Sequence, residues 1–191
     1  MLFFPVAAEI VGQTDSERRE AGQGVMTLGK FLADATCGST DKNVTFFPSY
    51  GAEQRGGTAN CYVVISDEEI GAPLGDVMDD LIVMNSASLQ KFLPKLKQGG
   101  RLFLNSSIVA DEIPRQDVKV VKAPVTELAL ELGSAKVLNI IMLGVYVGCT
   151  EVIAPQIVWE TVAHKLTGKA ALLPLNERAF QMGLELGKAQ R

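Results

Sequence analysis

Cysteine and histidine are scarce in this chain of 191 residues, which holds three cysteines and one histidine. Cys37, Cys61 and Cys149 are far apart in the sequence, so they predict neither a disulfide framework nor a cysteine-ligated metal or iron–sulfur site. A reducing, cytoplasmic compartment fits this cysteine usage best. His164 lies in a segment with helical spacing, where a solvated or half-buried side chain is more common than a catalytic one. With a single histidine and no Gly-x-Ser-x-Gly motif, an independent Ser–His–acid hydrolase is disfavoured.

Long apolar runs and an excess of positive charge are also missing. The formal net charge is −4, whereas binding to nucleic acids or anionic membranes needs clustered cations. The longest apolar run, residues 137–147, is broken by Asn139 and Gly144 and is too short for a membrane span. The first residues carry no Lys or Arg ahead of an apolar stretch and are interrupted by Pro5 and Glu9, which disfavours secretion. We expect neither nucleic acid nor membrane as a partner.

Short apolar runs alternate with amphipathic segments over most of the chain. The runs are rich in β-branched and aromatic residues, as is typical of strands, while the other segments repeat apolar residues at helical spacing. This alternation predicts an α/β protein with a three-layer α/β/α Rossmann-like sheet, and a 47% hydrophobic composition over 191 residues suits a single domain. The expected strands are 44–47, 59–65, 80–84, 101–104 and 118–121, and the expected later helices are 86–96, 125–132, 137–147, 155–166 and 174–188.

A first glycine turn, formed by Gly22, Gln23 and Gly24, precedes apolar residues at helical spacing. Glycines that open a helix let the backbone approach a phosphate, which the helix N-terminus attracts. The motif alone is more often a plain tight turn than a phosphate site. It lacks the full Gly-x-Gly-x-x-Gly spacing and a downstream acid for the ribose, so a nicotinamide cofactor is not expected.

A second glycine-rich loop, residues 49–58, lies between two expected strands. It holds a guanidinium, two glycine amides and a hydroxyl within four consecutive residues, a combination suited to phosphate or carboxylate oxygens. Further hydroxyl and amide groups stand at its two ends, and the alternative interpretation is a solvated turn. The residues concerned are Arg55, Gly56, Gly57 and Thr58, with Ser49 and Tyr50 at the start and Asn60 at the exit.

Residues 22–30, 47–61 and 64–67 closely resemble the γ subunit of 2-oxoacid:ferredoxin oxidoreductases. The similarity continues through 84–85, 99–100, 105–107, 124–129 and 139–144. The resemblance therefore defines a γ-type domain over 22–191 and leaves 1–21 as an N-terminal segment of uncertain structure.

The resemblance implies a division of labour between subunits. The chain has no catalytic residue and no metal site of its own, and it helps to bind coenzyme A and to assemble the complex. Thiamine diphosphate, Mg²⁺ and iron–sulfur clusters belong to the thiamine-diphosphate-binding α and β subunits and to a ferredoxin-like subunit, with external ferredoxin as electron acceptor. Either 2-oxoglutarate or a branched-chain 2-oxoacid is the favoured substrate. The residues that the family resemblance assigns to coenzyme A are Gly22, Gln23, Gly24, Thr27, Ser49, Tyr50, Arg55, Gly56, Gly57 and Thr58.

The sequence departs from the family before Gly22. The family usually has an apolar strand that runs directly into a loop of the form Gly-x-Gly-Gly-Gln-Gly, whereas here Glu17 to Ala21 precede Gly22. Either residues 3–11 supply that strand through a longer connection, or the phosphate loop is degraded; we favour a distorted first loop with the second intact. The alternative function is a free-standing nucleotide or acyl-coenzyme A binding module without catalytic partners.

Overall fold

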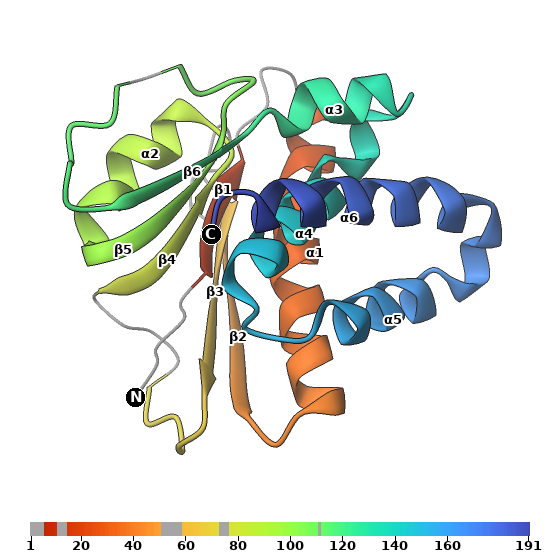
Figure 1. The fold of residues 1–191 in the computed structure, drawn as a ribbon, viewed down its shortest axis with the longest axis horizontal. Helices are drawn as coiled ribbons and strands as arrows, with labels where there is room; N and C mark the ends of the chain where they lie inside the picture. The colour runs from red at the N-terminus through yellow and green to blue at the C-terminus, as the bar shows by residue number, and fades with distance from the viewer. Residues whose placement is uncertain (1–5, 11–14, 51–58, 73–76, 111) are drawn as a thin grey trace.

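The computed structural model describes residues 6–10, 15–50, 59–72, 77–110 and 112–191. Within these ranges, strands and helices alternate along the chain (Figure 1). None of the described helices has both the length and the apolar character that crossing a membrane requires. The strands are β1 (Val6–Ile10), β2 (Asn43–Tyr50), β3 (Ala59–Ser66), β4 (Met78–Val83), β5 (Leu96–Asn105) and β6 (Lys119–Ala123). The helices are α1 (Asp15–Ser39), α2 (Ser86–Phe92), α3 (Val125–Glu131), α4 (Leu138–Thr150), α5 (Pro155–Lys165) and α6 (Leu173–Lys188), with 3-10 turns η1 (Leu93–Lys95), η2 (Ala135–Val137) and η3 (Thr167–Leu172).

The strands form one six-stranded sheet in the order β2-β3-β1-β4-β5-β6. β1, β4, β5 and β6 run parallel, whereas β3 is antiparallel to both β1 and β2. The expected strands are present as β2 to β6, and the expected later helices as α2 to α6. Their apolar residues are largely buried, which is why the sequence pattern identified them.

The N-terminal segment supplies the central strand of this sheet. Val6 and Glu9 of β1 are paired with Asp80 and Val83 of β4, and on its other side β1 pairs with β3. Strand formation within residues 3–11, as one of the two alternatives proposed, is therefore correct. The expected long connection is wrong, because α1 already begins at Asp15.

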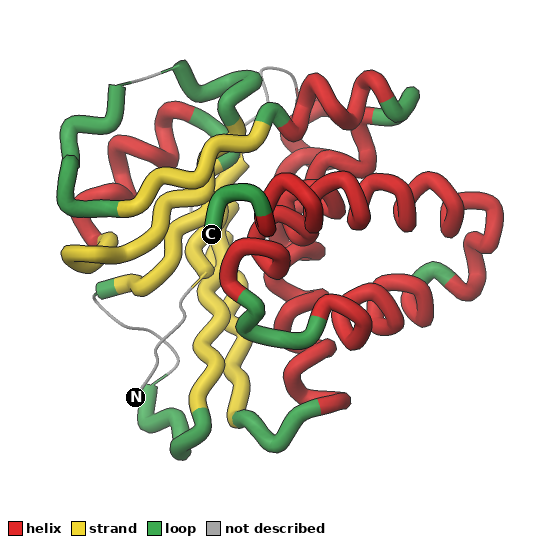
Figure 2. The backbone as a smooth tube through the Cα atoms, in the orientation of Figure 1, coloured by secondary structure: helices red, strands yellow, loops and turns green. Residues whose placement is uncertain are grey.

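The helices cover the two faces of the sheet unequally (Figures 1 and 2). α2 covers one face, where Phe92 packs in a small core with Leu102 and Leu104. α1 and α3 to α6 cover the other face, where the main core includes Phe103. Neighbouring residues of β5 thus serve different cores, because side chains alternate across a strand. The expected three-layer α/β/α arrangement is confirmed.

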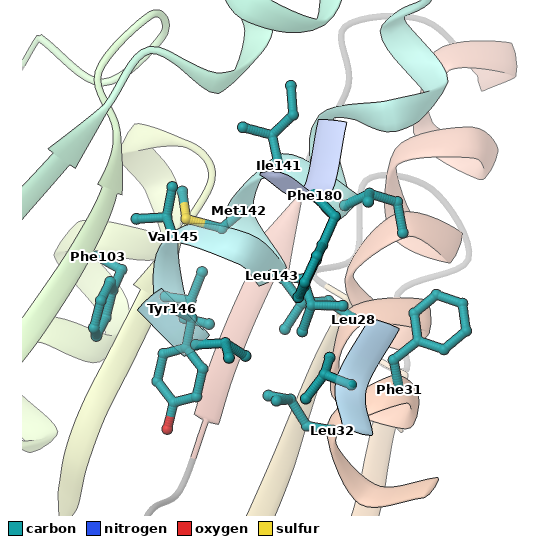
Figure 3. Packing of buried hydrophobic residues seen from close by; sticks show 14 of the residues in the cluster. Leu28, Phe31, Leu32, Phe103, Ile141, Met142, Leu143, Val145, Tyr146 and Phe180 are labelled. Atoms are coloured by element: carbon teal, nitrogen blue, oxygen red, sulfur yellow. The ribbon is translucent and has the colours of Figure 1, made fainter. Parts of the chain in front are cut away.

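An aromatic pair and a hydrogen bond to a buried carboxylate join α4 to the sheet. Phe103 and Tyr146 meet edge to face with ring centroids 5.1 Å apart (Figure 3). The Tyr146 hydroxyl donates a hydrogen bond of 3.0 Å to Oδ2 of Asp80. Arg101, the register partner of Asp80 on β5, forms an ion pair with the same carboxylate. Asp80 is fully buried, and such a charge is tolerated only when it is paired and hydrogen-bonded.

Glycines bring the backbones of α4 and α6 into direct contact. A Cβ added at Gly144 would lie 2.4 Å from the carbonyl oxygen of Phe180, and one added at Gly183 would lie 2.0 Å from that of Ile141. Both distances are far inside van der Waals contact. A side chain at either position would therefore push the two helices apart, so this packing requires residues without a Cβ.

Candidate functional site

The chain leaves β1 and β4 toward opposite faces of the sheet. β1 is followed by α1 on the face of the main core, and β4 is followed by α2 on the other face (Figure 1). Where the connections of neighbouring parallel strands diverge, open α/β sheets have a crevice at the strand carboxyl ends, and ligands bind there. This edge of the sheet is therefore the candidate functional site.

Asn85 shapes the turn at which β4 ends. The residue is 8% exposed, and its Oδ1 accepts hydrogen bonds from Ser88 N at 2.9 Å and from Ser88 Oγ at 3.0 Å. An asparagine with extended backbone that bonds the N–H three residues later is a favoured N-cap. This cap begins α2 shortly after β4, and so fixes the course of the chain at this edge of the sheet.

Asn105 joins the end of β5 to the start of α3 at the same edge. Its Nδ2 donates to Oγ1 of Thr126 at 2.9 Å, while its Oδ1 accepts from Ser107 N at 3.3 Å. Ser107 Oγ in turn accepts from the N–H of Glu127, at 3.2 Å, in the first turn of α3. The turn after β5 and the start of α3 are thereby held together by side chains that are 20 or 21 residues apart in the sequence.

Three of the predicted coenzyme A residues do not lie in a loop. Gly22, Gln23 and Gly24 fall inside α1, and the prediction that they open a helix is wrong. The preceding segment, residues 15–21, contains two Glu, two Arg and one Ala, which favour helix, and the helix starts at Asp15. N–H groups beyond the first turn bond within the helix and are not available to a phosphate. Thr27 lies further along α1 and is partly buried.

Ser49 and Tyr50 are strand residues rather than the start of a loop, because β2 continues to Tyr50. Ser49 is paired with Asn60 and Tyr50 with Ala59 of β3. On its other side, β3 pairs Ala59 with Ile10, the last residue of β1. The structure therefore brings Ser49 and Tyr50 to the edge at which the parallel strands end.

The remaining predicted residues, Arg55, Gly56, Gly57 and Thr58, lie outside the described residues. Asn85 and Asn105 entered the sequence analysis only through the family resemblance, and no role was predicted for them. The signal that could have identified them is an asparagine directly after a buried strand, since this is where α/β sheets place ligand-binding groups. Their own side chains are buried and hydrogen-bonded within the turns after β4 and β5, so they shape the edge rather than offer free polar groups to it.

The cysteines do not form a reactive centre at this edge. Cys61 is fully buried in β3, and burial raises the pKa of its thiol to about 12. Cys61 is therefore a small strand residue rather than a nucleophile, because the thiolate is the reactive form. In the part of the chain that the structure describes, no group of three or more His, Cys, Asp or Glu side chains could hold a metal ion.

His164 lies in a separate hollow of about 450 Å³ between α1 and α5. Cys37 and Glu160 line the same hollow, and an ion pair of 3.0 Å between Lys165 and Asp34 crosses it. His164 is exposed on α5, as the helical spacing predicted. The hollow lies away from the carboxyl ends of the strands, so it is not part of the candidate site.

Comparison with known proteins identifies the family. The family described as pyruvate ferredoxin/flavodoxin oxidoreductase matches residues 20–186. The 2-oxoglutarate synthase subunit KorC of Methanocaldococcus jannaschii is 31% identical over 87% of this chain and 89% of its own length. The ketoisovalerate oxidoreductase subunit VorA of Methanothermobacter marburgensis is 33% identical over 86% of this chain, but the chain spans only 34% of that relative. The chain therefore covers about a third of the length of the VorA relatives.

Solved structures agree with the sequence relatives. The gamma subunit of a keto/oxoacid ferredoxin oxidoreductase from Geobacter sulfurreducens PCA has a TM-score of 0.84 at 26% identity, covering 100% of this chain and 99% of that one. A 2-oxoglutarate:ferredoxin oxidoreductase from Magnetococcus marinus, with 2-oxoglutarate, coenzyme A and succinyl-CoA bound, has a TM-score of 0.83 at 27% identity and covers 100% of this chain and 31% of that one. The resemblance seen in the sequence is confirmed: the chain belongs to the pyruvate ferredoxin/flavodoxin oxidoreductase family and has the fold of its gamma subunits.

Proposed function

We propose that this chain is the γ-type part of a 2-oxoacid:ferredoxin oxidoreductase. Such an enzyme decarboxylates a 2-oxoacid, transfers the acyl group to coenzyme A and passes electrons to ferredoxin. The observation that carries the proposal is the likeness over the whole chain to the Magnetococcus marinus enzyme, whose structure holds 2-oxoglutarate, coenzyme A and succinyl-CoA. The chain has no catalytic role alone and acts in the cytoplasm as part of a heteromeric complex.

The chain contributes to the coenzyme A site through the carboxyl edge of its sheet. Ser49 and Tyr50 end β2 there, and residues 51–58, which contain Arg55, join this strand to β3. A guanidinium followed by two glycines suits phosphate oxygens, while Asn85 and Asn105 fix the turns that follow β4 and β5 at the carboxyl edge. Gly22, Gln23 and Gly24 take no part as a phosphate loop, because they lie within α1.

The chemistry of decarboxylation and electron transfer belongs to partner subunits. We assign thiamine diphosphate and Mg²⁺ to the α and β subunits and the iron–sulfur clusters to a ferredoxin-like subunit, with external ferredoxin as acceptor. The favoured substrate is 2-oxoglutarate or a branched-chain 2-oxoacid. The named relatives support this preference, because KorC and VorA subunits are 31–34% identical to the chain, whereas the pyruvate synthase subunits PorC are 26–27% identical.

The proposal is tested by isolating the chain with its companions from its source cells. Mass spectrometry identifies the companions, and the isolate is assayed for coenzyme A-dependent oxidation of 2-oxoglutarate, 2-oxoisovalerate and pyruvate with a low-potential acceptor. We expect subunits that bind thiamine diphosphate and iron–sulfur clusters at a fixed ratio, together with activity. A monomer that binds coenzyme A but has no companions supports the free-standing binding module instead. A monomer that does not bind coenzyme A contradicts both functions.

A further inference from the structure

The two outer strands of the sheet differ in how their edges are protected. β6 ends the sheet on one side and β2 on the other. The backbone of Lys122 in β6 is already paired, because its N–H donates to Oε1 of Gln190 at 3.1 Å and its carbonyl oxygen accepts from Nε2 of Gln190 at 3.0 Å. The Gln190 amide thus takes the place of a neighbouring strand. β6 also carries two lysines, Lys119 and Lys122, and lysine on an edge strand opposes pairing with another chain.

β2 carries no charge that opposes such pairing. Its eight residues, Asn43–Tyr50, include no charged side chain, and among the described strands only β3 pairs with it. Proline within a sheet turns its nitrogen to the open side of an edge strand, so Pro48 indicates which way the backbone of β2 is turned. Successive residues direct their N–H and C=O groups to opposite sides of a strand. The backbone groups of Val44 and Phe46 therefore face the same open side as Pro48.

β2 is complementary to itself about a two-fold axis at Thr45. In an antiparallel pair centred there, Val44 of each copy lies opposite Phe46 of the other, and their outward N–H and C=O groups bond reciprocally. A β-branched residue opposite an aromatic one is also a favourable cross-strand pair. In this register Pro48 faces Lys42 of the second copy, whose N–H is already bonded within its own chain at 3.3 Å. The missing donor of Pro48 thus falls at the end of the paired segment.

Thr45 brings an unsatisfied hydroxyl to this axis. Its Oγ1 is buried and has no hydrogen-bond partner among the described residues. Val44 and Phe46 pack against the main core on the side of α1, so Thr45 belongs to the other face of the sheet, together with Phe47, which is 40% exposed. On the axis the two Thr45 side chains are directly opposite each other, and threonines in this arrangement form cross-strand hydrogen bonds. A hydroxyl without a partner in one chain can therefore obtain one from its copy.

We propose that two copies of this chain join through β2, paired antiparallel about Thr45, so that one sheet continues across both copies. A two-fold contact uses the same patch on both subunits, as this register requires, and the uncharged strand causes no repulsion between them. The paired segment, 43–47, precedes Ser49 and Tyr50, so the carboxyl edge of the sheet remains accessible. The proposal goes beyond the proposed function, because the contact needs neither coenzyme A nor other subunits.

Cysteine cross-linking tests the register. In the full chain with Cys37→Ser, which removes the exposed native thiol, Thr45→Cys is compared with Asn43→Cys under oxidation by copper phenanthroline and oxygen. Opposite residues of a non-hydrogen-bonded antiparallel pair have Cα atoms about 4.5 Å apart, which a disulfide can span. The two copies of residue 43 are about 13 Å apart along the strands. We expect Thr45→Cys to give a disulfide-linked dimer on a non-reducing gel, and Asn43→Cys to give none.

Sedimentation equilibrium measures the association itself. We expect the wild type to dimerise, and Thr45→Lys to raise the dissociation constant of the dimer at least about tenfold, because like charges directly opposite destabilise a strand pair. Ala171→Lys is the matched control, since it adds the same charge at an exposed position of η3, and it should associate as the wild type does.

A wild type that is monomeric at every concentration overturns the proposal. So does a dimer in which Thr45→Cys does not cross-link, or one that Thr45→Lys leaves as tight as before. If Thr45→Lys does not fold, the comparison of the two cysteine variants decides the matter. Where the chain is isolated only with companions, the same cross-linking is applied to the assembled complex, and the same outcomes hold.

Discussion

Arg101 of β5 donates two hydrogen bonds to the buried carboxylate of Asp80 in β4, from Nε at 2.5 Å and from Nη2 at 2.7 Å. The Tyr146 hydroxyl completes the set from α4. The three groups tie adjacent strands to the helix layer. The three groups lie toward the amino-terminal ends of the parallel strands, whereas the candidate site lies at their carboxyl ends. Their role is therefore structural.

Removal of the cation leaves the buried carboxylate without compensation. We expect Arg101→Met to lower the free energy of unfolding by about 3 to 5 kcal/mol, measured by urea denaturation. Lys97→Met is the control, because Lys97 pairs with Asp79 in the same two strands but is 49% exposed; its expected cost is below about 1 kcal/mol. Equal effects of the two substitutions contradict the prediction.

The ionisation of Asp80 makes stability depend on pH. Burial raises the pKa of Asp80 above its ordinary value of 3.8, although the hydrogen bonds and charge of Arg101 and the hydrogen bond from Tyr146 act in the other direction. A raised native pKa means that the folded state holds this proton more tightly than the unfolded state. Its contribution to stability is therefore complete below pH 3.8 and is lost as pH rises through the native pKa.

Asp80→Asn removes this titration. We expect the free energy of unfolding of the wild type, relative to that of Asp80→Asn, to fall as pH rises from about 3 to 7. Chemical denaturation of both proteins across this range measures the difference. A difference that grows with pH indicates that Arg101 outweighs burial, and the prediction is then wrong.

The contact of α4 with α6 predicts a sharp effect of single methyl groups. Gly144→Ala and Gly183→Ala place a Cβ against backbone atoms that cannot rotate away, and overpacking of this kind costs about 1 to 3 kcal/mol. Gly38→Ala is the control, because Gly38 lies in α1 with open space around it, where alanine favours the helix by up to about 1 kcal/mol. Thermal unfolding should show a lower melting temperature for Gly144→Ala and for Gly183→Ala, and an equal or higher one for Gly38→Ala.

The sequence predicted most elements because their signals are local. β2 to β6 carry continuous β-branched and apolar runs, which need no partner to be identified. β1 could not be assigned in this way, since Val6–Ile10 contains two alanines and a glutamate and becomes a strand through its pairing with β3 and β4. Strand formation in this segment thus depends on contacts with residues far along the chain.

The glycines of α1 were misread for a physical reason. Glycine is typical of turns because of its backbone freedom, which predicted a turn at Gly22 and Gly24. Helices also use glycine for close packing, as at Gly29 of the same helix, where an added Cβ would lie 2.5 Å from Cys61 Sγ. Composition cannot separate these two uses. The network of Asn105, Ser107 and Thr126 was also beyond sequence reasoning, because only the sheet topology brings the end of β5 to the start of α3.

The thiols are expected to react at very different rates. Cys37 is exposed, whereas Cys61 and Cys149 are buried, and burial raises the pKa of both buried thiols. With a disulfide reagent under native conditions, we expect one rapidly modified thiol, and modification of the others only on unfolding. Cys37→Ser should abolish the rapid phase. A rapid phase that persists in this variant shows that a buried cysteine is accessible.

Arg55 is the cation that the proposed coenzyme A site requires. If its guanidinium meets phosphate oxygens of coenzyme A, Arg55→Ala in the assembled enzyme removes a charge-assisted contact of about 1.5 to 3 kcal/mol, which raises KM for coenzyme A about ten- to a hundredfold. KM for the 2-oxoacid should change little, because the proposed function assigns decarboxylation to partner subunits. Arg178→Ala is the matched control, since Arg178 is exposed on α6 in the helical layer. Steady-state kinetics with each substrate varied in turn measures both constants. An unchanged KM for coenzyme A, or an equal rise for both substrates, contradicts the assignment of Arg55 to the phosphates.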